Sequence, residues 1–148
     1  MCNENAGGCA GELLATDAYQ LLLTNVDSIL IDVRTQAEWT YVGVPDLTSI
    51  GKTAIFLEWQ SFPAMRVDPA FAARLSAMLQ DMRVAPQAPL LFLCRSGARS
   101  RHAATAMTNA GWAQCFNIWD GFEGPLDPRR RRNVVGGWKA ANLPWSQS

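Results

Sequence analysis

The chain has 148 residues, which is enough for one domain to bury a core without disulfides or metal ions. Apolar residues make up 49% and charged residues 18%, and this balance argues against a disordered chain. Basic and acidic residues number 13 each, so no net charge draws the whole protein toward nucleic acid or a membrane.

The sequence gives no sign of export or membrane insertion. No apolar run approaches the ~20 residues that span a bilayer, and residues 1–11 lack a basic stretch followed by an apolar one. The four cysteines match no zinc-binding spacing, and there is one histidine. We therefore expect a cytoplasmic protein with reduced thiols, without a metal ion or a cofactor.

The first part of the chain predicts a tail, a helix and a buried strand. Residues 1–11 are small and polar and indicate a flexible tail, followed by a single domain over residues 12–148. A helix is expected from Thr16, a capping residue, to Asn25. Residues 28–33 (SILIDV) are typical of a strand that is buried on both faces.

The middle of the chain adds a short helix, a second strand and a longer helix. Thr35 and Glu38 have the spacing of a capping box, which predicts a helical turn. Residues 53–59 (TAIFLEW) predict a strand. Asp68 followed by Pro69 indicates a helix start, and apolar residues continue from there at helical spacing.

The last part contains the chemically informative strand. Residues 90–93 (LLFL) form a buried strand that leads directly into Cys94, and a helix is expected from about 100 to 110. A further strand is expected over 114–118, and a short helix over 138–142. Because strands and helices alternate, the pattern predicts an α/β fold with a mainly parallel sheet.

Cys94 stands where such a fold binds ligands, beyond the carboxyl end of a strand. The following loop contains Gly97, which permits a positive φ, and opens a helix whose amino end favours anions. Arg95, Arg99 and Arg101 add positive charge, and no carboxylate lies between residues 94 and 101. This pattern indicates a reactive thiolate or another sulfur anion on Cys94. The alternative is a buried, inert cysteine; His102 is interpreted as a helix surface or packing residue.

Several motifs in this order resemble the single-domain rhodanese-like sulfurtransferases. They are the loop at 94–100 (CRSGARS), the stretch 31–39 (IDVRTQAEW), the stretch 110–122 and the ending at 138–144. The resemblance extends from about Leu14 to Pro144.

The resemblance implies five parallel strands with helices on both faces, and a ping-pong cycle. Cys94 would take sulfur from a small anionic donor such as thiosulfate and pass it to cyanide or a thiol. The resemblance further implies a persulfide-binding loop formed by Arg95, Ser96, Gly97, Ala98, Arg99 and Ser100. Asp32 and Arg34 are expected to support that loop. No nucleic-acid or membrane partner is implied.

Two segments depart from the family pattern. Residues 42–47 (VGVPDL) replace the usual GHIPGA, and a long segment, 60–69, precedes the next helix. Trp59, Phe62 and Met65 could wall the pocket or simply pack within this segment.

Two further features remain open. The run Arg129–Arg132 indicates a solvated loop, with nucleic-acid binding as the less favoured interpretation. Cys2 and Cys9 are interpreted as incidental thiols of the tail; the alternative is that they resolve a persulfide on Cys94.

Other function classes use a similar plan of strand, cysteine, loop and helix. Cysteine phosphatases and arsenate reductases of this plan place an arginine after five intervening residues, whereas Arg99 follows Cys94 after four. The shorter loop favours a sulfur atom over phosphate. A sulfur-carrying or regulatory module without thiosulfate turnover is the main alternative, and the sequence does not choose between them.

Overall fold

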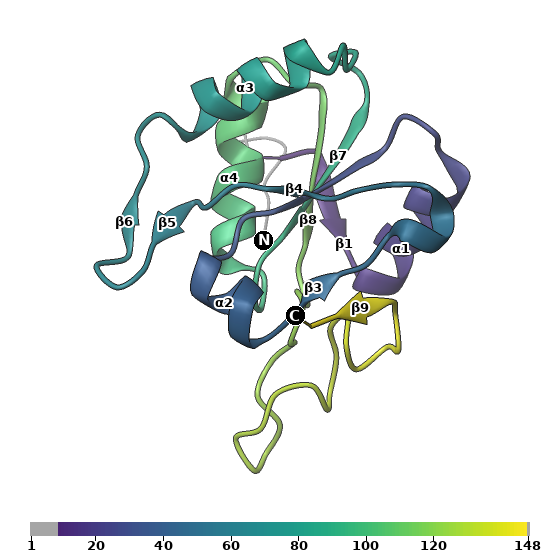
Figure 1. The fold of residues 1–148 in the computed structure, drawn as a ribbon, viewed down its shortest axis with the longest axis vertical. Coiled ribbons are helices and arrows are strands. Elements are labelled where there is room, and N and C mark those ends of the chain that lie inside the picture. Colours follow the sequence, from purple (N-terminus) through teal and green to yellow (C-terminus); the bar gives the residue numbers. More distant parts are fainter. Residues whose placement is uncertain (1–8, 148) are drawn as a thin grey trace.

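The computed structural model describes residues 9–147 and contains a five-stranded, fully parallel sheet of order β1-β8-β7-β2-β4 (Figure 1). Its strands are β1 Gly11–Leu13, β2 Ile29–Asp32, β4 Ile55–Phe56, β7 Pro89–Leu93 and β8 Gln114–Ile118. The helices are α1 Ala15–Thr24, α2 Gln36–Tyr41, α3 Phe71–Asp81 and α4 Ala98–Asn109, with a 3-10 turn at Thr48–Ile50. Two small antiparallel ladders join β3 Val44–Pro45 to β9 Trp145–Ser146, and β5 Gln60–Ser61 to β6 Arg66–Val67.

Helices cover both faces of the sheet, which confirms the predicted α/β class. Side chains alternate along the central strand β7: Leu90 and Phe92 pack in the core beneath α3 and α4, whereas Leu91 and Leu93 pack in the core beneath α1 (Figure 1). All five residues of β7 are buried. The strand that leads to Cys94 therefore lies at the centre of the molecule.

Helices α1 and α2, which begin near the carboxyl ends of the strands, are capped in different ways. Thr35 and Glu38 form the predicted capping box at the start of α2. The predicted first helix is present as α1, but its predicted cap is wrong: the helix begins at Ala15, one residue before Thr16, and no local side chain caps it. Instead Asp120 Oδ1 accepts the Ala15 N–H at 2.8 Å across the fold. Burial raises the pKa of Asp120, and hydrogen bonds from the backbone only partly offset this.

The predicted tail boundary at residue 11 needs correction. Cys9 is buried, the Ala10 N–H donates to the Cys115 carbonyl at 2.7 Å, and Gly11 begins β1. Pairing with β8 supplies the backbone hydrogen bonds that composition alone did not predict. Residues 1–8, including Cys2, lie outside the described residues.

Three other elements differ from the sequence prediction. The strand expected over 53–59 is reduced to β4, and α3 begins at Phe71, after Asp68 has accepted a turn hydrogen bond from Ala70. Residues 138–142 form turns rather than a helix. There the chain folds around the fully buried Trp138, whose indole N–H donates to the Pro144 carbonyl at 2.7 Å.

Among residues 9–147, no helix is both long and apolar enough to cross a bilayer.

Candidate active site

Cys94 lies between the end of β7 and the start of α4, with 1% of its surface exposed. Its Sγ accepts the Gly97 N–H at 3.1 Å and contacts the Ser100 hydroxyl, also at 3.1 Å. Gly97 adopts φ 103°, which turns its N–H back toward the sulfur. The Cys94 sulfur thus lies at the amino end of a 12-residue helix and accepts one backbone hydrogen bond there.

A polar chain leads from Cys94 across the sheet. The Ser100 hydroxyl donates to Asn117 Oδ1 at 2.5 Å, and Asn117 Nδ2 donates to the Gly97 carbonyl at 3.0 Å and to Glu12 Oε2 at 2.7 Å. Ser100 and Asn117 are both fully buried. Asn117 therefore holds the Ser100 hydroxyl and the Gly97 backbone beside the sulfur. The sequence placed Asn117 in the family-like stretch 110–122 but did not indicate this role.

The loop after β8 contacts the other side of the candidate catalytic loop, residues 94–100, which is called the catalytic loop below. The Phe122 N–H donates to the Cys94 carbonyl at 2.8 Å, and the Glu123 N–H donates to the Arg95 carbonyl at 3.0 Å. A side chain at Gly97 would overlap the Trp119 carbonyl, so the two loops meet backbone against backbone. This packing fixes the position of Cys94 without using its side chain.

Arg99 makes an ion pair with Glu38 of α2. Its guanidinium donates to the two carboxylate oxygens at 2.6 and 3.0 Å, and both side chains are mostly buried. Burial would raise the pKa of Glu38, but the hydrogen bond and charge of Arg99 outweigh it and the pKa is lowered. Burial would lower the pKa of Arg99, but Glu38 raises it. Arg99 thus connects the catalytic loop to α2. Glu38, which the sequence predicts only as a helix-capping residue, therefore belongs to the candidate site as well.

A cavity of about 620 Å³ opens over the catalytic loop. Arg95, exposed, and the partly exposed Glu123 bring charge to its wall, and Phe62 and Met65 from the β5–β6 hairpin bring apolar surface. Trp59 packs edge-to-face on Phe71, with ring centroids 5.0 Å apart. The long segment after β4 therefore supplies pocket walls through Phe62 and Met65, and core packing through Trp59.

Asp32 and Arg34 form a fully buried ion pair. Arg34 Nη2 donates to Asp32 Oδ2 at 2.7 Å and to the Gly43 carbonyl at 2.8 Å, and the guanidinium lies 4.2 Å from the ring centre of Phe122. Within residues 9–147, no hydrogen bond joins either side chain directly to the catalytic loop. Their contact with it runs through Phe122, whose backbone binds Cys94.

The sequence profile of the family described as "STR4 middle domain" matches residues 11–148. A relative in Arabidopsis thaliana, the chloroplastic rhodanese-like domain-containing protein 4, is 28% identical over 131 residues, 88% of this chain and 24% of that protein. The chain belongs to this rhodanese-like family. An uncharacterized protein of Rickettsia conorii is 41% identical over 133 residues, 90% of this chain and 94% of its relative. The crystal structure of Rv0390 from M. tuberculosis has a TM-score of 0.83 and 40% identity, over 95% of this chain and 99% of that one.

Membership and fold identify the chain as a rhodanese-like module of the sulfur-transfer type. Within the part of the chain that the structure describes, no three His, Cys, Asp or Glu side chains gather closely enough to hold a metal ion.

The other cysteines that the structure describes in the rhodanese-like domain are Cys115, a free thiol that lies away from Cys94, and Cys9. Cys115 on β8 pairs in register with Leu90 on β7, which comes four positions before Cys94. At ~3.3 Å per residue, Cys115 and Cys94 are about 13 Å apart along the strand direction. Burial raises the pKa of Cys115 to about 11, so it is a neutral thiol at pH 7. Cys9 is buried beside Cys115 and takes part in a disulfide bond, so the expected free, exposed thiol at position 9 is wrong. His102 is exposed on α4, as predicted.

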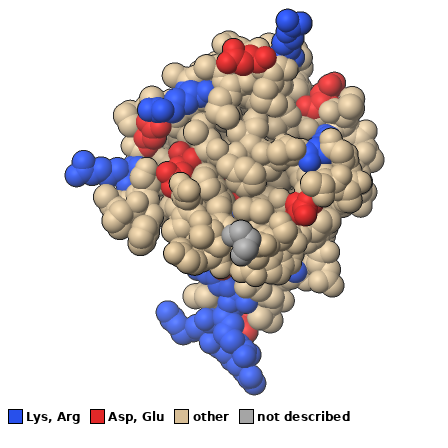
Figure 2. All heavy atoms as spheres, viewed as in Figure 1, with Lys and Arg blue, Asp and Glu red and all other residues tan. Residues whose placement is uncertain are grey.

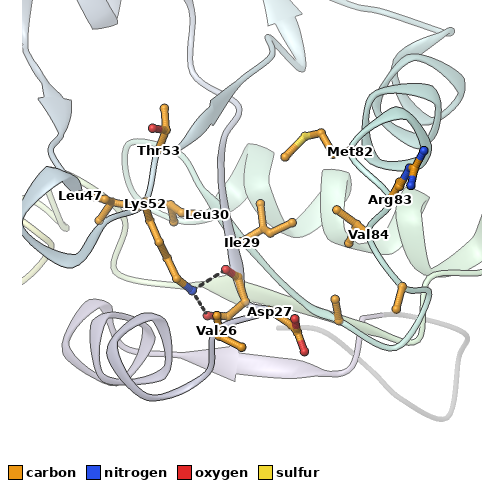
Figure 3. Close-up of a pocket in the computed structure, with 13 residues that line it drawn as sticks. Val26, Asp27, Ile29, Leu30, Leu47, Lys52, Thr53, Met82, Arg83 and Val84 are labelled. Atoms are coloured by element: carbon orange, nitrogen blue, oxygen red, sulfur yellow. Dashed lines mark hydrogen bonds between the residues drawn. The ribbon is translucent and has the colours of Figure 1, made fainter.

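A second cavity, of about 380 Å³, lies at the opposite, amino-terminal edge of the sheet (Figure 3). Lys52 points across it and donates from Nζ to the carbonyl and hydroxyl oxygens of Ser28, at 2.7 and 2.8 Å, and to the Asn25 carbonyl at 2.8 Å. All three N–H groups of the ammonium are thereby used within the chain. This lysine ties α1 to the start of β2, and no cysteine lines the cavity.

Proposed function

We propose that this domain is a sulfurtransferase that carries a sulfane sulfur on Cys94. The observation that carries the proposal is the surroundings of the Cys94 Sγ, where the Gly97 N–H and the Ser100 hydroxyl both lie at 3.1 Å at the start of α4. The Gly97 N–H and the amino end of α4 support an anionic sulfur, whether a thiolate or a persulfide. Ser96 and Ala98 complete the loop that would surround it.

The proposed reaction has two steps. The Cys94 thiolate attacks the outer sulfur of thiosulfate; a new sulfur–sulfur bond forms, the donor's own bond breaks, and sulfite leaves with the bonding electrons. An acceptor, cyanide or a thiolate, then attacks the outer sulfur of the persulfide, and Cys94 leaves as a thiolate. The products are thiocyanate or an acceptor persulfide, and no external oxidant or reductant enters the balance. The exposed Arg95 at the cavity wall would attract the anionic donor.

The position of Arg99 argues against phosphatase or arsenate reductase chemistry. In those reactions the loop encircles an oxyanion and its arginine binds that oxyanion. Here both terminal nitrogens of the Arg99 guanidinium donate to Glu38. A sulfur-carrier role without thiosulfate turnover has one observation in its favour. The cavity of about 620 Å³ is of the size that holds drug-like ligands, far larger than thiosulfate, and part of its wall is apolar.

The test compares Cys94→Ser with Cys115→Ser as a matched control. We expect thiocyanate formation from thiosulfate and cyanide to be abolished in Cys94→Ser and unchanged in Cys115→Ser. Mass spectrometry of the thiosulfate-treated protein should show one added sulfur atom, localised to Cys94. Thiocyanate formation at the wild-type rate in Cys94→Ser would overturn the assignment. An added sulfur on Cys94 without thiocyanate formation would favour the carrier role.

A further inference from the structure

Residues 125–135, here termed the arginine loop, project from the body of the molecule next to the catalytic loop. They contain the four consecutive arginines Arg129–Arg132, in a chain whose net charge is zero. Figure 2 shows basic side chains gathered at the lower end of the molecule, where Figure 1 places the long connection between β8 and β9. Positive and negative charges balance over the whole chain, but positive charge is concentrated in this loop.

The arginine loop has a closed neck. Gly124 and Gly137 both have positive φ, and a side chain at Gly124 would overlap the Gly136 carbonyl, so the two ends of the loop touch backbone to backbone. Arg132 Nη1 donates to the Gly124 carbonyl at 2.7 Å across this neck. A loop whose ends meet in this way is a compact unit held in a defined place, and not a loose linker.

A buried carboxylate shapes the loop from inside. Asp127 Oδ1 accepts the backbone N–H groups of Arg129 at 2.9 Å and Arg131 at 2.7 Å, and the Arg131 side chain lies 3.7 Å from Oδ2. The Arg129 and Arg130 side chains are exposed and have no ion-pair partner among residues 9–147. The fold thus presents at least two uncompensated guanidinium groups to solvent.

The surface beside these arginines is aliphatic. Leu126, Val134 and Val135 are 43%, 58% and 60% exposed. Arginine is enriched at protein–protein contacts, and these aliphatic side chains add apolar surface that a protein partner can cover. The loop itself holds no aromatic residue on which nucleic-acid bases could stack, which favours a protein partner over nucleic acid.

Backbone hydrogen bonds join the neck of the arginine loop to two residues that line the cavity of the candidate site. The Gly124 N–H donates to the Arg95 carbonyl at 3.2 Å, and the Asn133 N–H donates to the Glu123 carbonyl at 2.8 Å. Glu123 and Arg95 both line the cavity over the catalytic loop. A partner held by the loop would therefore lie beside the cavity that Arg95, the residue after Cys94, lines.

We propose that the arginine loop is a docking surface for an acidic segment of the protein that accepts sulfur from Cys94. The proposal rests on the proposed sulfur-transfer function. Attraction between the arginines and acidic side chains would raise the rate of encounter and orient the acceptor thiol toward the cavity. Small acceptors such as cyanide would not need the loop.

The test uses two cysteine peptides as probes, one with four glutamates around the cysteine and one with four glutamines. The Cys94 persulfide is loaded with thiosulfate and its transfer to each peptide is followed. We expect the wild-type protein to prefer the acidic peptide by roughly tenfold at low salt, and high salt to reduce this preference. Arg129→Gln/Arg130→Gln should remove most of the preference while leaving transfer to cyanide within twofold (about the scatter of such rates).

The control variant Arg74→Gln/Arg83→Gln removes the same charge from the region of α3, at the far end of the molecule in Figure 1, and should retain the preference. Binding of both peptides to Cys94→Ser protein, measured by fluorescence anisotropy, separates docking from sulfur transfer, because this variant needs no chemistry to bind. Equal binding of the two peptides, or a preference that survives Arg129→Gln/Arg130→Gln, would overturn the proposal. So would tight binding of a labelled single-stranded RNA that depends on the arginine loop without any preference for the acidic peptide.

Discussion

Arg99 and Glu38, 61 positions apart in the chain, are joined by a two-pronged ion pair at 2.6 and 3.0 Å. The same Glu38 oxygen that accepts Arg99 Nη1 also receives the Thr35 hydroxyl at 3.1 Å, so one carboxylate caps α2 and anchors the catalytic loop. The two loop arginines therefore have different tasks. Both line the cavity, but Arg95 is exposed, whereas the guanidinium of Arg99 is held by Glu38.

Replacing the two arginines separately should separate these tasks. Arg95→Ala is expected to raise the KM for thiosulfate about two- to fivefold, the effect of one exposed charge, with little change in Tm. Arg99→Ala should lower Tm instead, because it leaves Glu38 without its partner. Steady-state kinetics and thermal unfolding of both variants check this. A KM effect confined to Arg99→Ala would show that Arg99 leaves Glu38 to bind the donor.

The lowered pKa of Glu38 predicts a pH dependence of stability. Because the folded-state pKa lies below the reference value of 4.5, the carboxylate is charged and paired above about pH 4.5, and its contribution is lost as the pH falls through the folded pKa. Glu38→Gln should cost roughly 1–3 kcal/mol at pH 7. The difference in the free energy of unfolding between wild type and variant should narrow as the pH drops below 4.5. If this difference in the free energy of unfolding stayed constant down to pH 3, Glu38 would not be the group whose protonation weakens the fold.

Asp32→Ala should be strongly destabilising, by about 3–5 kcal/mol, because it leaves the Arg34 guanidinium buried without a counter-charge. The double variant Asp32→Leu/Arg34→Met removes both charges and should be much more stable than the single one. Urea unfolding measures both. Thiocyanate formation by the double variant then tests the support role: retained activity means that the pair only holds the fold, and loss of activity in a stable double variant would point to a direct role.

The Ser100 hydroxyl donates its single hydrogen to Asn117 Oδ1, and its oxygen lies 3.1 Å from the Cys94 sulfur. Ser100→Ala removes this polar contact and leaves Asn117 Oδ1 buried without its donor, at a cost of roughly 1–3 kcal/mol, so kcat/KM for thiosulfate should fall about 5- to 150-fold. Asn117→Ala acts partly through Ser100, so its effect should be smaller in the Ser100→Ala background than alone. Strictly additive losses in this double-mutant cycle would show that the two residues act independently.

Much of the fold was predictable because local patterns encode it. The run LLFL is apolar at every position, as a strand with two covered faces must be, and the Thr35–Glu38 spacing produced its capping box. Gly97 at the predicted turn has φ 103°, as a loop curling around the Cys94 sulfur requires. The family resemblance at residues 94–100 and 31–39 pointed to the same site.

The strand–cysteine–loop–helix unit and the α/β order of elements thus follow from the sequence alone, because they depend on residues that are neighbours in the chain. Four contacts were visible only in the folded molecule: Arg99 binds Glu38, Asn117 holds Ser100, Asp120 caps α1, and Cys9 is buried beside β8. Each of these contacts joins segments remote in sequence. A side chain with several possible partners is committed to one of them by the packing of the sheet and its helices, which brings the two groups within hydrogen-bonding distance and excludes water.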